Sequence, residues 1–277
     1  MPVIIAGILN VTPDSFADGG RFASVESAVE AGLAMALAGA HWVDVGGEST
    51  RPKAEPVAES EEILRVVPVV ELLAQSLGQR ARISIDTYKA GTAHAALDAG
   101  ATLVNDVSGG LLDPSILKVA AKAGVPVILG HLRGQPATMM ADVHFEDVVA
   151  EVGAELGERI AAARAAGCRE IWADPGIGFG KTMEHNLRLL AGLAELRARL
   201  GVPIMVGVSR KRFIGDLTGQ PVNQRAFGTA GAVAAAVLGG AAAVRVHDVR
   251  EMGDVVKVAE AIIASAGRAS YNGNPHV

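Results

Sequence analysis

The sequence predicts an α/β protein in which eight parallel strands close into a single (β/α)8, or TIM, barrel. Short apolar runs rich in β-branched residues alternate with longer alanine-rich segments. In the longer segments leucine and valine recur every three or four residues, which is typical of helices that bury one face. Eight such strand and helix units follow one another without a linker or a change in composition, which indicates parallel βαβ units in one closed barrel. An open, doubly wound sheet is the alternative architecture.

The expected elements follow directly from this alternation. Strands are expected at 3–9, 42–46, 82–86, 102–106, 125–130, 170–174, 203–208 and 243–247. Helices are expected at 24–39, 57–77, 89–99, 114–123, 145–166, 184–200, 223–238 and 251–265. Several helices end in a glycine just before the next strand, where a left-handed C-cap is common. We therefore expect one domain over 1–277, with 268–277 as a frayed tail.

Composition limits the classes of partner. Half of the residues are hydrophobic and 20% are charged, which is enough for a large core and excludes a disordered chain. The net charge of -5 disfavours nucleic acid and anionic membranes as partners. No apolar run has the length of a membrane span. The lone cysteine, Cys168, and an N-terminus without a secretory pattern predict a reducing cytoplasm, and we expect Cys168 to be a packed residue rather than a nucleophile.

Polar side chains stand where the expected strands end. In chain order they are Asn10; Glu48, Ser49, Thr50 and Arg51; Asp86 and Thr87; Asn105 and Asp106; His131; Asp174; Ser209, Arg210 and Lys211; Arg245, His247 and Asp248. Any single one could be a helix N-cap. Because the loops after all eight strands of a barrel converge at one end, the whole set predicts one site.

The charges of this set indicate the kind of ligand. Asp86, Asp174 and Asn105 can accept hydrogen bonds from amino and ring N–H groups. The cationic members, Arg51, Arg210, Lys211, Arg245 and His247, can bind anions. We therefore expect a small ligand with a polar heterocycle and an anionic group. The segment 174–181 ends like a phosphate-binding P-loop, but its glycine spacing is one residue short of that motif.

Seven segments of the chain resemble the dihydropteroate synthase family, in the family's order and over residues 5–265. They are GILNVTPDSFADGG (7–20), VDVGGESTRP (43–52), SIDTYKA (84–90), NDVSGG (105–110), DPGIGFGK (174–181), SRKRFIG (209–215) and VRVHDV (244–249). The chain departs from the family's usual pattern at Ala6, Lys53 and Leu129-Gly130, which bear on packing and the pocket rim. The resemblance implies a transferase of folate biosynthesis. Such an enzyme condenses 6-hydroxymethyl-7,8-dihydropterin pyrophosphate with p-aminobenzoate, and it is a target of sulfonamides that mimic the arylamine.

The resemblance also implies residue roles. Pterin binding falls to Asp86, Asn105, Asp174 and Lys211, and pyrophosphate binding to Asn10, Arg245 and His247, with Asn10 also a ligand of the cofactor Mg²⁺. The catalytic residues would be Asp86, Lys211, Arg245 and His247. Thr50, Arg51 and Pro52 lie in a loop expected to close over p-aminobenzoate, in a pocket that Phe179, Ser209 and Arg210 help to wall. The family implies a homodimer.

Two other functions stay open at this point. A pterin-dependent methyltransferase barrel would use the same Asp and Asn set, but it needs a corrinoid-bearing partner. A catalytically idle barrel could serve as a binding module. The loop after Asn10 and the segment SRK at 209–211 speak against the methyltransferase, and the retained charged loop residues speak against the idle barrel. Release of pyrophosphate would separate the synthase from both.

Overall fold

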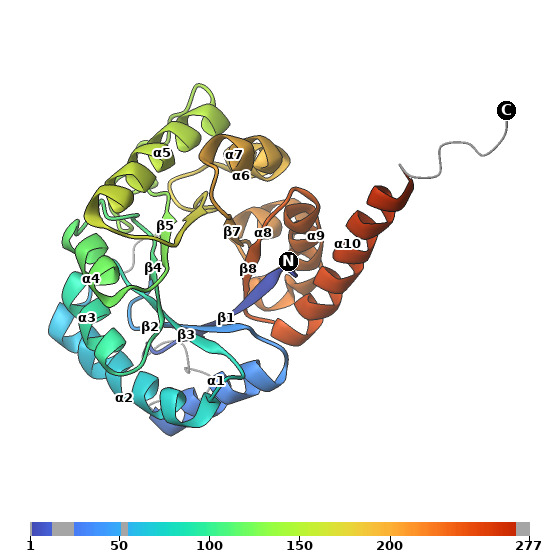
Figure 1. Cartoon of the computed structure of the whole chain (residues 1–277). Coiled ribbons are helices and arrows are strands. Elements are labelled where there is room, and N and C mark those ends of the chain that lie inside the picture. Colours follow the sequence, from blue (N-terminus) through green and yellow to red (C-terminus); the bar gives the residue numbers. More distant parts are fainter. Residues whose placement is uncertain (1, 13–24, 51–54, 270–277) are drawn as a thin grey trace, which may run out of the picture.

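Eight strands stand side by side in a ring with helices outside it (Figure 1). This computed structural model describes residues 2–12, 25–50 and 55–269 of the chain. All neighbouring strands are parallel, in the order β6-β5-β4-β3-β2-β1-β8-β7. The strands are β1 (Ile4–Asn10), β2 (Trp42–Gly46), β3 (Arg82–Asp86), β4 (Leu103–Asp106), β5 (Val127–Gly130), β6 (Ile171–Asp174), β7 (Met205–Gly207) and β8 (Ala243–Val246).

The seam between β6 and β7 decides between a barrel and an open sheet. A parallel bridge pairs Ala173 with Ile204, and the Ala173 amide donates to the Pro203 carbonyl at 3.0 Å. The first and last strands of the hydrogen-bonded order are thereby joined. The predicted (β/α)8 barrel is confirmed, and the open doubly wound sheet is wrong.

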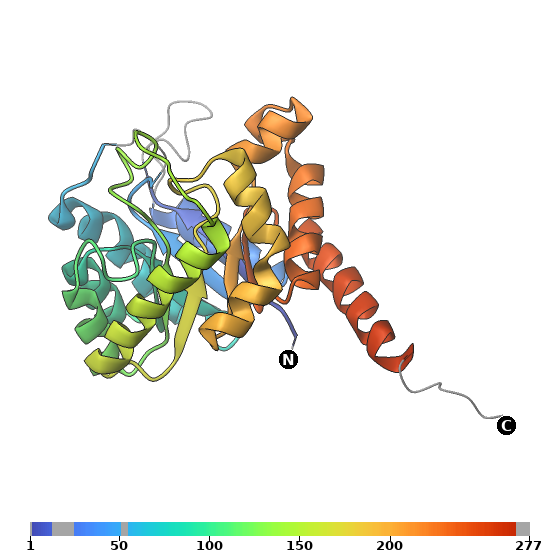
Figure 2. The ribbon, with the colours of Figure 1, turned by 90° about the horizontal axis from the view of Figure 1, so that it is seen from above.

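Helices cover the outside of the ring, and α10 extends beyond the barrel wall (Figure 2). They are α1 (Val25–Leu37), α2 (Glu59–Leu77), α3 (Ala90–Asp98), α4 (Ser115–Ala123), α5 (Val148–Ala166), α6 (Met183–Ala191), α7 (Leu193–Leu200), α8 (Arg212–Thr218), α9 (Ala226–Leu238) and α10 (Val249–Ala269), with a 3-10 turn, η2, at Val222–Gln224. Within the described residues, no helix combines the length and the apolar character needed to cross a bilayer.

Three expectations about helices were wrong in detail. The helix expected at 184–200 is two helices, α6 and α7, which meet at Gly192; a Cβ there would lie 2.9 Å from a methyl group of Val149. Helix α8 was not expected, because seven residues are too few to show a helical period. Helix α10 runs to Ala269, beyond the expected end at 265, and residues 270–277 of the expected tail lie outside the described residues.

The main core lies between the strands and the surrounding helices. Outward-facing residues such as Val43, Val45 and Ile85 pack there against fully buried leucine and valine side chains of the helices. Cys168 is buried with them, and its Sγ donates to the Leu117 carbonyl at 3.3 Å. It is a packed residue, as expected.

A second, smaller apolar cluster fills the lower part of the barrel interior. Seven of the eight strands contribute one residue each: Ala6, Trp42, Leu103, Ile128, Trp172, Met205 and Ala243. The rings of Trp42 and Trp172 meet edge to face, with their centroids 5.2 Å apart. Ala6 is the register partner of Trp42, so a small residue on β1 leaves room for a large neighbour. The departure at Ala6 therefore concerns the packing of the barrel interior.

Candidate functional site

The polar layer of the barrel lies two residues further along each strand than the apolar cluster. Side chains of a strand alternate between its two faces, so two steps from Trp42, Leu103, Trp172 and Ala243 bring Asp44, Asn105, Asp174 and Arg245 to the interior. A pocket at this end is lined by Thr50, Asp86, Asn105, Val107, Gly130, Asp174, Gly176, Phe179, Gly207, Lys211 and Arg245. The structure thus brings Asp174 and Arg245 to one cavity, on either side of the glycine on β7.

Gly207 lies between these two charged groups. Gly207 and Arg245 are register partners on β7 and β8. A Cβ at Gly207 would lie 3.9 Å from both Asp174 Oδ2 and Arg245 Cβ. A Cβ would make ordinary contacts there, so only a long side chain at this position would extend between the two charged groups into the pocket.

Arg245 sits between two carboxylates. Its Nε donates to Asp44 Oδ2, and its Nη2 donates to Asp86 Oδ2. Burial lowers the pKa of Arg245, but the charges of Asp86 and Asp44 outweigh burial, and the net effect is a raised pKa. The guanidinium is therefore permanently charged and fixed in orientation, as a binding group for an anion requires.

Burial also acts on the carboxyl groups of the pocket. It raises the pKa of Asp86 to about 7, although the charge of Arg245 opposes that rise. Burial raises the pKa of Asp174 as well, against a hydrogen bond of 2.7 Å that its Oδ1 accepts from the Gly176 amide. A carboxyl group accepts hydrogen bonds when ionised and can donate one when protonated, so two buried carboxyl groups with raised pKa values suit a heterocycle with N–H groups and ring nitrogens.

Asp44 is a site residue that sequence reasoning missed. Its Oδ2 accepts from Asn105 Nδ2 at 3.0 Å in addition to Arg245. Asp44 is buried, and its Oδ1 has no hydrogen-bond partner among the described residues. The signal that could have found it is the alternation itself, because Asp44 stands two residues after Trp42 and two before Gly46. The sequence argument selected polar residues at or near the ends of strands and did not select Asp44.

An aromatic ring and a lysine form the other wall of the pocket. Lys211 Nζ lies 4.1 Å from the centroid of the Phe179 ring, a distance suited to a cation–π contact. Gly178 has a φ of 84°, and a Cβ there would lie 3.0 Å from Lys211 Cδ, so glycine is needed beside the lysine stem. Phe179 belongs to the loop after β6, and Lys211 belongs to the loop after β7.

Ser209, Arg210 and His247 lie together but do not line the pocket. Ser209 Oγ is 2.9 Å from His247 Nδ1 and accepts from the His247 amide at 3.2 Å. Arg210 adopts a φ of 56°, the only left-handed non-glycine residue in the described chain, and pairs with Asp248 through Nε at 3.2 Å and Nη2 at 2.5 Å. The roles expected for these residues stay predictions.

The first two loops are described only in part. Asn10 ends β1 and is half-buried, and Thr50 lines the pocket. Arg51, Pro52 and Lys53 lie outside the described residues, as does most of the segment 7–20 beyond Thr12. Their expected roles in closing the site stay predictions.

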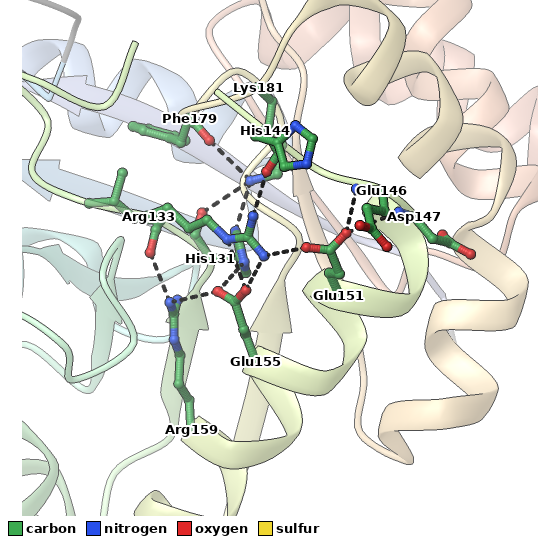
Figure 3. Close-up of polar contacts among 11 residues, drawn as sticks. His131, Arg133, His144, Glu146, Asp147, Glu151, Glu155, Arg159, Phe179 and Lys181 are labelled. Carbon is green, nitrogen blue, oxygen red and sulfur yellow. Dashed lines mark hydrogen bonds and ion pairs between the residues drawn. The ribbon is translucent and has the colours of Figure 1, made fainter. Parts of the chain in front are cut away.

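A second polar network, behind the pocket, was also missed (Figure 3). His131 Nε2 lies 3.1 Å from Glu155 Oε2 on α5, and His131 Nδ1 lies 2.8 Å from Lys181 Nζ. Arg133 donates to both Glu155 and Glu151. Burial and the charge of Lys181 lower the pKa of His131 to about 3, and burial lowers the pKa of Lys181 to about 7. No pattern in the sequence pairs His131 with a residue in the middle of a distant helix.

Comparisons with known proteins agree with this geometry. The family of pterin binding enzymes matches residues 6–247. The dihydropteroate synthase of Synechocystis is 46% identical over 261 residues, which cover 93% of this chain and 89% of that protein. A structure of the Yersinia pestis dihydropteroate synthase with a sulfonamide drug superposes with a TM-score of 0.89 at 42% identity, covering 95% of each chain.

A second solved structure, the Xanthomonas albilineans dihydropteroate synthase in complex with 7,8-dihydropteroate, gives a TM-score of 0.84 at 43% identity, covering 95% of this chain and 94% of that one. These matches run along nearly the whole barrel, including every strand that carries a pocket residue. The chain therefore belongs to the pterin binding enzymes and, within them, to the dihydropteroate synthases, which are transferases of folate synthesis.

Proposed function

We propose that this barrel condenses 6-hydroxymethyl-7,8-dihydropterin pyrophosphate with p-aminobenzoate, giving 7,8-dihydropteroate and pyrophosphate. The observation that carries the proposal is the gathering of Asp86, Asn105, Asp174, Lys211 and Arg245 around one pocket. Hydrogen-bond acceptors for a heterocycle and cations for an anion are thereby available within one cavity. The similar enzyme that holds 7,8-dihydropteroate supports the same pair of substrates.

The pterin ring would bind among the acidic and amide side chains. Asp174 and Asn105 would accept hydrogen bonds from its amino group and ring N–H, and Lys211 would donate to its carbonyl oxygen. Asp86, held by Arg245, would face the remaining edge of the ring. Because the acidic and amide side chains of this set stand on strands, the methylene carbon would be presented in one orientation.

The bond change needs no strong base. An arylamine is unprotonated at neutral pH, so its nitrogen is ready to attack. In a dissociative substitution the C–O bond breaks, pyrophosphate leaves with the electron pair, the pterin ring shares the positive charge left on the methylene, and the nitrogen then bonds to that carbon. The nitrogen then loses one proton. The negative charge that grows on the leaving group would be stabilised by Arg245 and His247, the latter held by Ser209. Phe179 and Lys211 would wall the p-aminobenzoate end. The roles predicted for Thr50, Arg51, Pro52, Ser209 and Arg210 at that end belong to the same proposal.

The residues present fit the expected cofactor, Mg²⁺, if the metal is held mainly by the pyrophosphate of the substrate. Among the described residues, no three His, Cys, Asp or Glu side chains come together to hold a metal. Mg²⁺ commonly keeps several waters and binds substrate phosphates with one or two protein oxygens. Asn10, at the end of β1, would supply such an oxygen. When bound, the metal would offset charge on the leaving pyrophosphate.

The activity is tested by pyrophosphate release. Release is expected only when the pterin pyrophosphate and p-aminobenzoate are both present, and a chain that binds a pterin but never releases pyrophosphate would instead be a binding module. Asp174→Asn is expected to lower kcat/KM by about 10- to 150-fold, the effect of one hydrogen bond to a charged group. The exposed Asp98→Asn serves as the control, and equal rates for the two variants would contradict the role of Asp174.

A homodimer in the cytoplasm is part of the same proposal. Helices α9 and α10 pack side by side and leave large apolar side chains exposed, among them Phe227, which is 94% exposed, and Val258 and Ile262. Exposed apolar surface of this kind commonly marks a protein interface. Light scattering should give the mass of two chains, and a monomer at micromolar concentration would contradict the proposal. The single cysteine supports a reducing compartment.

A further inference from the structure

The network behind the pocket ends on the backbone of a pocket residue (Figure 3). Lys181 Nζ donates to the Phe179 carbonyl at 3.0 Å and lies 2.8 Å from His131 Nδ1. Lys181 is only 3% exposed, and within the described residues none of its hydrogen-bond partners is a carboxylate. Burying an ammonium group without an opposite charge costs stability, so this lysine is not explained by stability.

The hydrogens of the network can be assigned from its partners. His131 is fully buried and neutral at ordinary pH, because burial and the charge of Lys181 lower its pKa to about 3. A neutral imidazole has one N–H. Glu155 can only accept, since the hydrogen bond from His131, together with one from Arg133, lowers its pKa to about 2. The N–H is therefore on Nε2, and Nδ1 accepts from Lys181.

The loop that carries Phe179 has few other side-chain contacts. Its backbone turns on Gly176, Gly178 and Gly180, all at positive φ. The Gly178 amide donates to Asn186 Oδ1 at 2.7 Å, and the Phe179 amide donates to the Gly176 carbonyl at 3.0 Å. A loop so rich in glycine has many backbone conformations to choose from. The bond from Lys181 to the Phe179 carbonyl removes that freedom at the one residue whose ring reaches the pocket.

Phe179 is thus held from two directions. Its carbonyl is bound by Lys181 on the side of β5 and α5, and its ring lies 4.1 Å from Lys211 Nζ on the pocket side. Turning the carbonyl away from Lys181 would rotate the backbone that carries the ring. The position of the pocket wall therefore depends on a chain of contacts that begins at Glu155, on the outer layer of helices.

We propose that Lys181 is a positioning residue for the p-aminobenzoate end of the pocket, holding the Phe179 carbonyl with the support of His131 and Glu155. The inference rests on the proposed function, because it concerns the second substrate of that reaction. It assigns to Lys181 no contact with either substrate. Its effect should therefore appear in the binding of p-aminobenzoate and not in the binding of the pterin.

The test compares the two Michaelis constants of Lys181→Met with those of the unchanged chain. The KM for p-aminobenzoate should rise about tenfold, the effect of losing one hydrogen bond from a charged group. The KM for the pterin pyrophosphate should change by less than about twofold, because the contact that is weakened belongs to the p-aminobenzoate end of the pocket. Equal rises in both constants would indicate a general structural role and overturn the proposal, as would no change in either.

A second pair of variants keeps the test valid if Lys181→Met does not fold. Glu155 and Glu151 lie one turn apart on α5 and both bind Arg133, but only Glu155 contacts His131. Glu155→Leu should raise the KM for p-aminobenzoate selectively, whereas Glu151→Leu should leave it unchanged. The same rise in both variants would assign the effect to Arg133 and overturn the proposal.

The two proposals fail in different ways. If the unchanged chain releases no pyrophosphate, the proposed function fails, and calorimetric titration with p-aminobenzoate still measures the pocket. A selective loss of p-aminobenzoate affinity in Lys181→Met would then support the positioning role without turnover. If the unchanged chain is active and Lys181→Met binds p-aminobenzoate with the same affinity, only the positioning role fails.

Discussion

Arg245 and Lys181 are two cations at the same end of the barrel, and their surroundings give them opposite properties. Arg245 keeps 18% of its side chain exposed and contacts the carboxylates of Asp44 and Asp86, and its pKa is raised. Lys181 contacts a ring nitrogen and carbonyl oxygens, and burial lowers its pKa to about 7. Burial opposes charge in both cases, so the contacting carboxylates decide which cation stays charged.

The difference separates two uses of a buried cation. Arg245 is part of a charge cluster in which each member compensates another, and a substrate anion can be added to it. The charge of Lys181 has no carboxylate among its hydrogen-bond partners in the described part of the chain, and its Nζ donates to the backbone carbonyl of Phe179. One residue therefore suits binding a charged group, and the other suits fixing a loop.

The largest expected effect is that of Arg245→Met. This change leaves the carboxyl groups of Asp44 and Asp86 next to each other without their cation, and breaking a buried pair from one side costs about 3 kcal/mol or more in free energy of unfolding. Urea denaturation at pH 8 measures this loss. Arg245→Lys, which keeps the charge, should lose less. A loss below about 1 kcal/mol for Arg245→Met would show that the carboxylates are not stabilised by the arginine.

A smaller effect, which depends on pH, is expected at Lys181. The unfolded lysine holds its proton up to about its ordinary pKa of 10.5, whereas the folded lysine releases it from about 7. Between these values the unfolded state binds more protons, so this residue makes the free energy of unfolding rise with pH. Urea denaturation of the unchanged chain and Lys181→Met between pH 7 and 9 should show a flatter dependence for the variant. Parallel curves would mean that the lysine keeps its proton when folded.

The smallest effect is expected where a cation and a carboxylate meet near the surface. In the pair of Arg210 and Asp248 the side chains are 35% and 21% exposed. Water already solvates both groups, so Asp248→Asn should lower the free energy of unfolding by about 1 kcal/mol or less. Thermal unfolding in low and high salt checks this, since a screened pair should lose its contribution in salt. If Asp248→Asn lowered the free energy of unfolding as much as Arg245→Met, burial would not explain the difference between the two ion pairs.

The barrel and the first layer of the site could be predicted because both depend on periodic features. Strand and helix alternation gives the fold, and the end of each strand gives Asp86, Asn105, Asp174 and Lys211, all of which line one pocket. Asp44 lies inside its strand, and only a register with two-residue alternation identifies it. It was within reach of the sequence but was not found.

The second layer could not be predicted in the same way. His131 directly follows β5, but Glu155 lies in the middle of α5 and Lys181 lies at the end of a glycine-rich loop. Their meeting depends on how far α5 is turned about its own axis against β5, which tertiary packing sets and no local pattern records. The break of a predicted helix at Gly192 has the same origin, because it answers a contact with Val149 on another helix.

The edge-to-face pair of Trp42 and Trp172 has a practical consequence. These are the only two tryptophans in the chain, and both stand inside the ring of strands, directly below the charged layer. The tryptophan fluorescence of the protein, excited apart from that of its two tyrosines, therefore originates from the barrel interior. An emission shift on denaturation would report the opening of the strands themselves, without a label and without a background from surface loops.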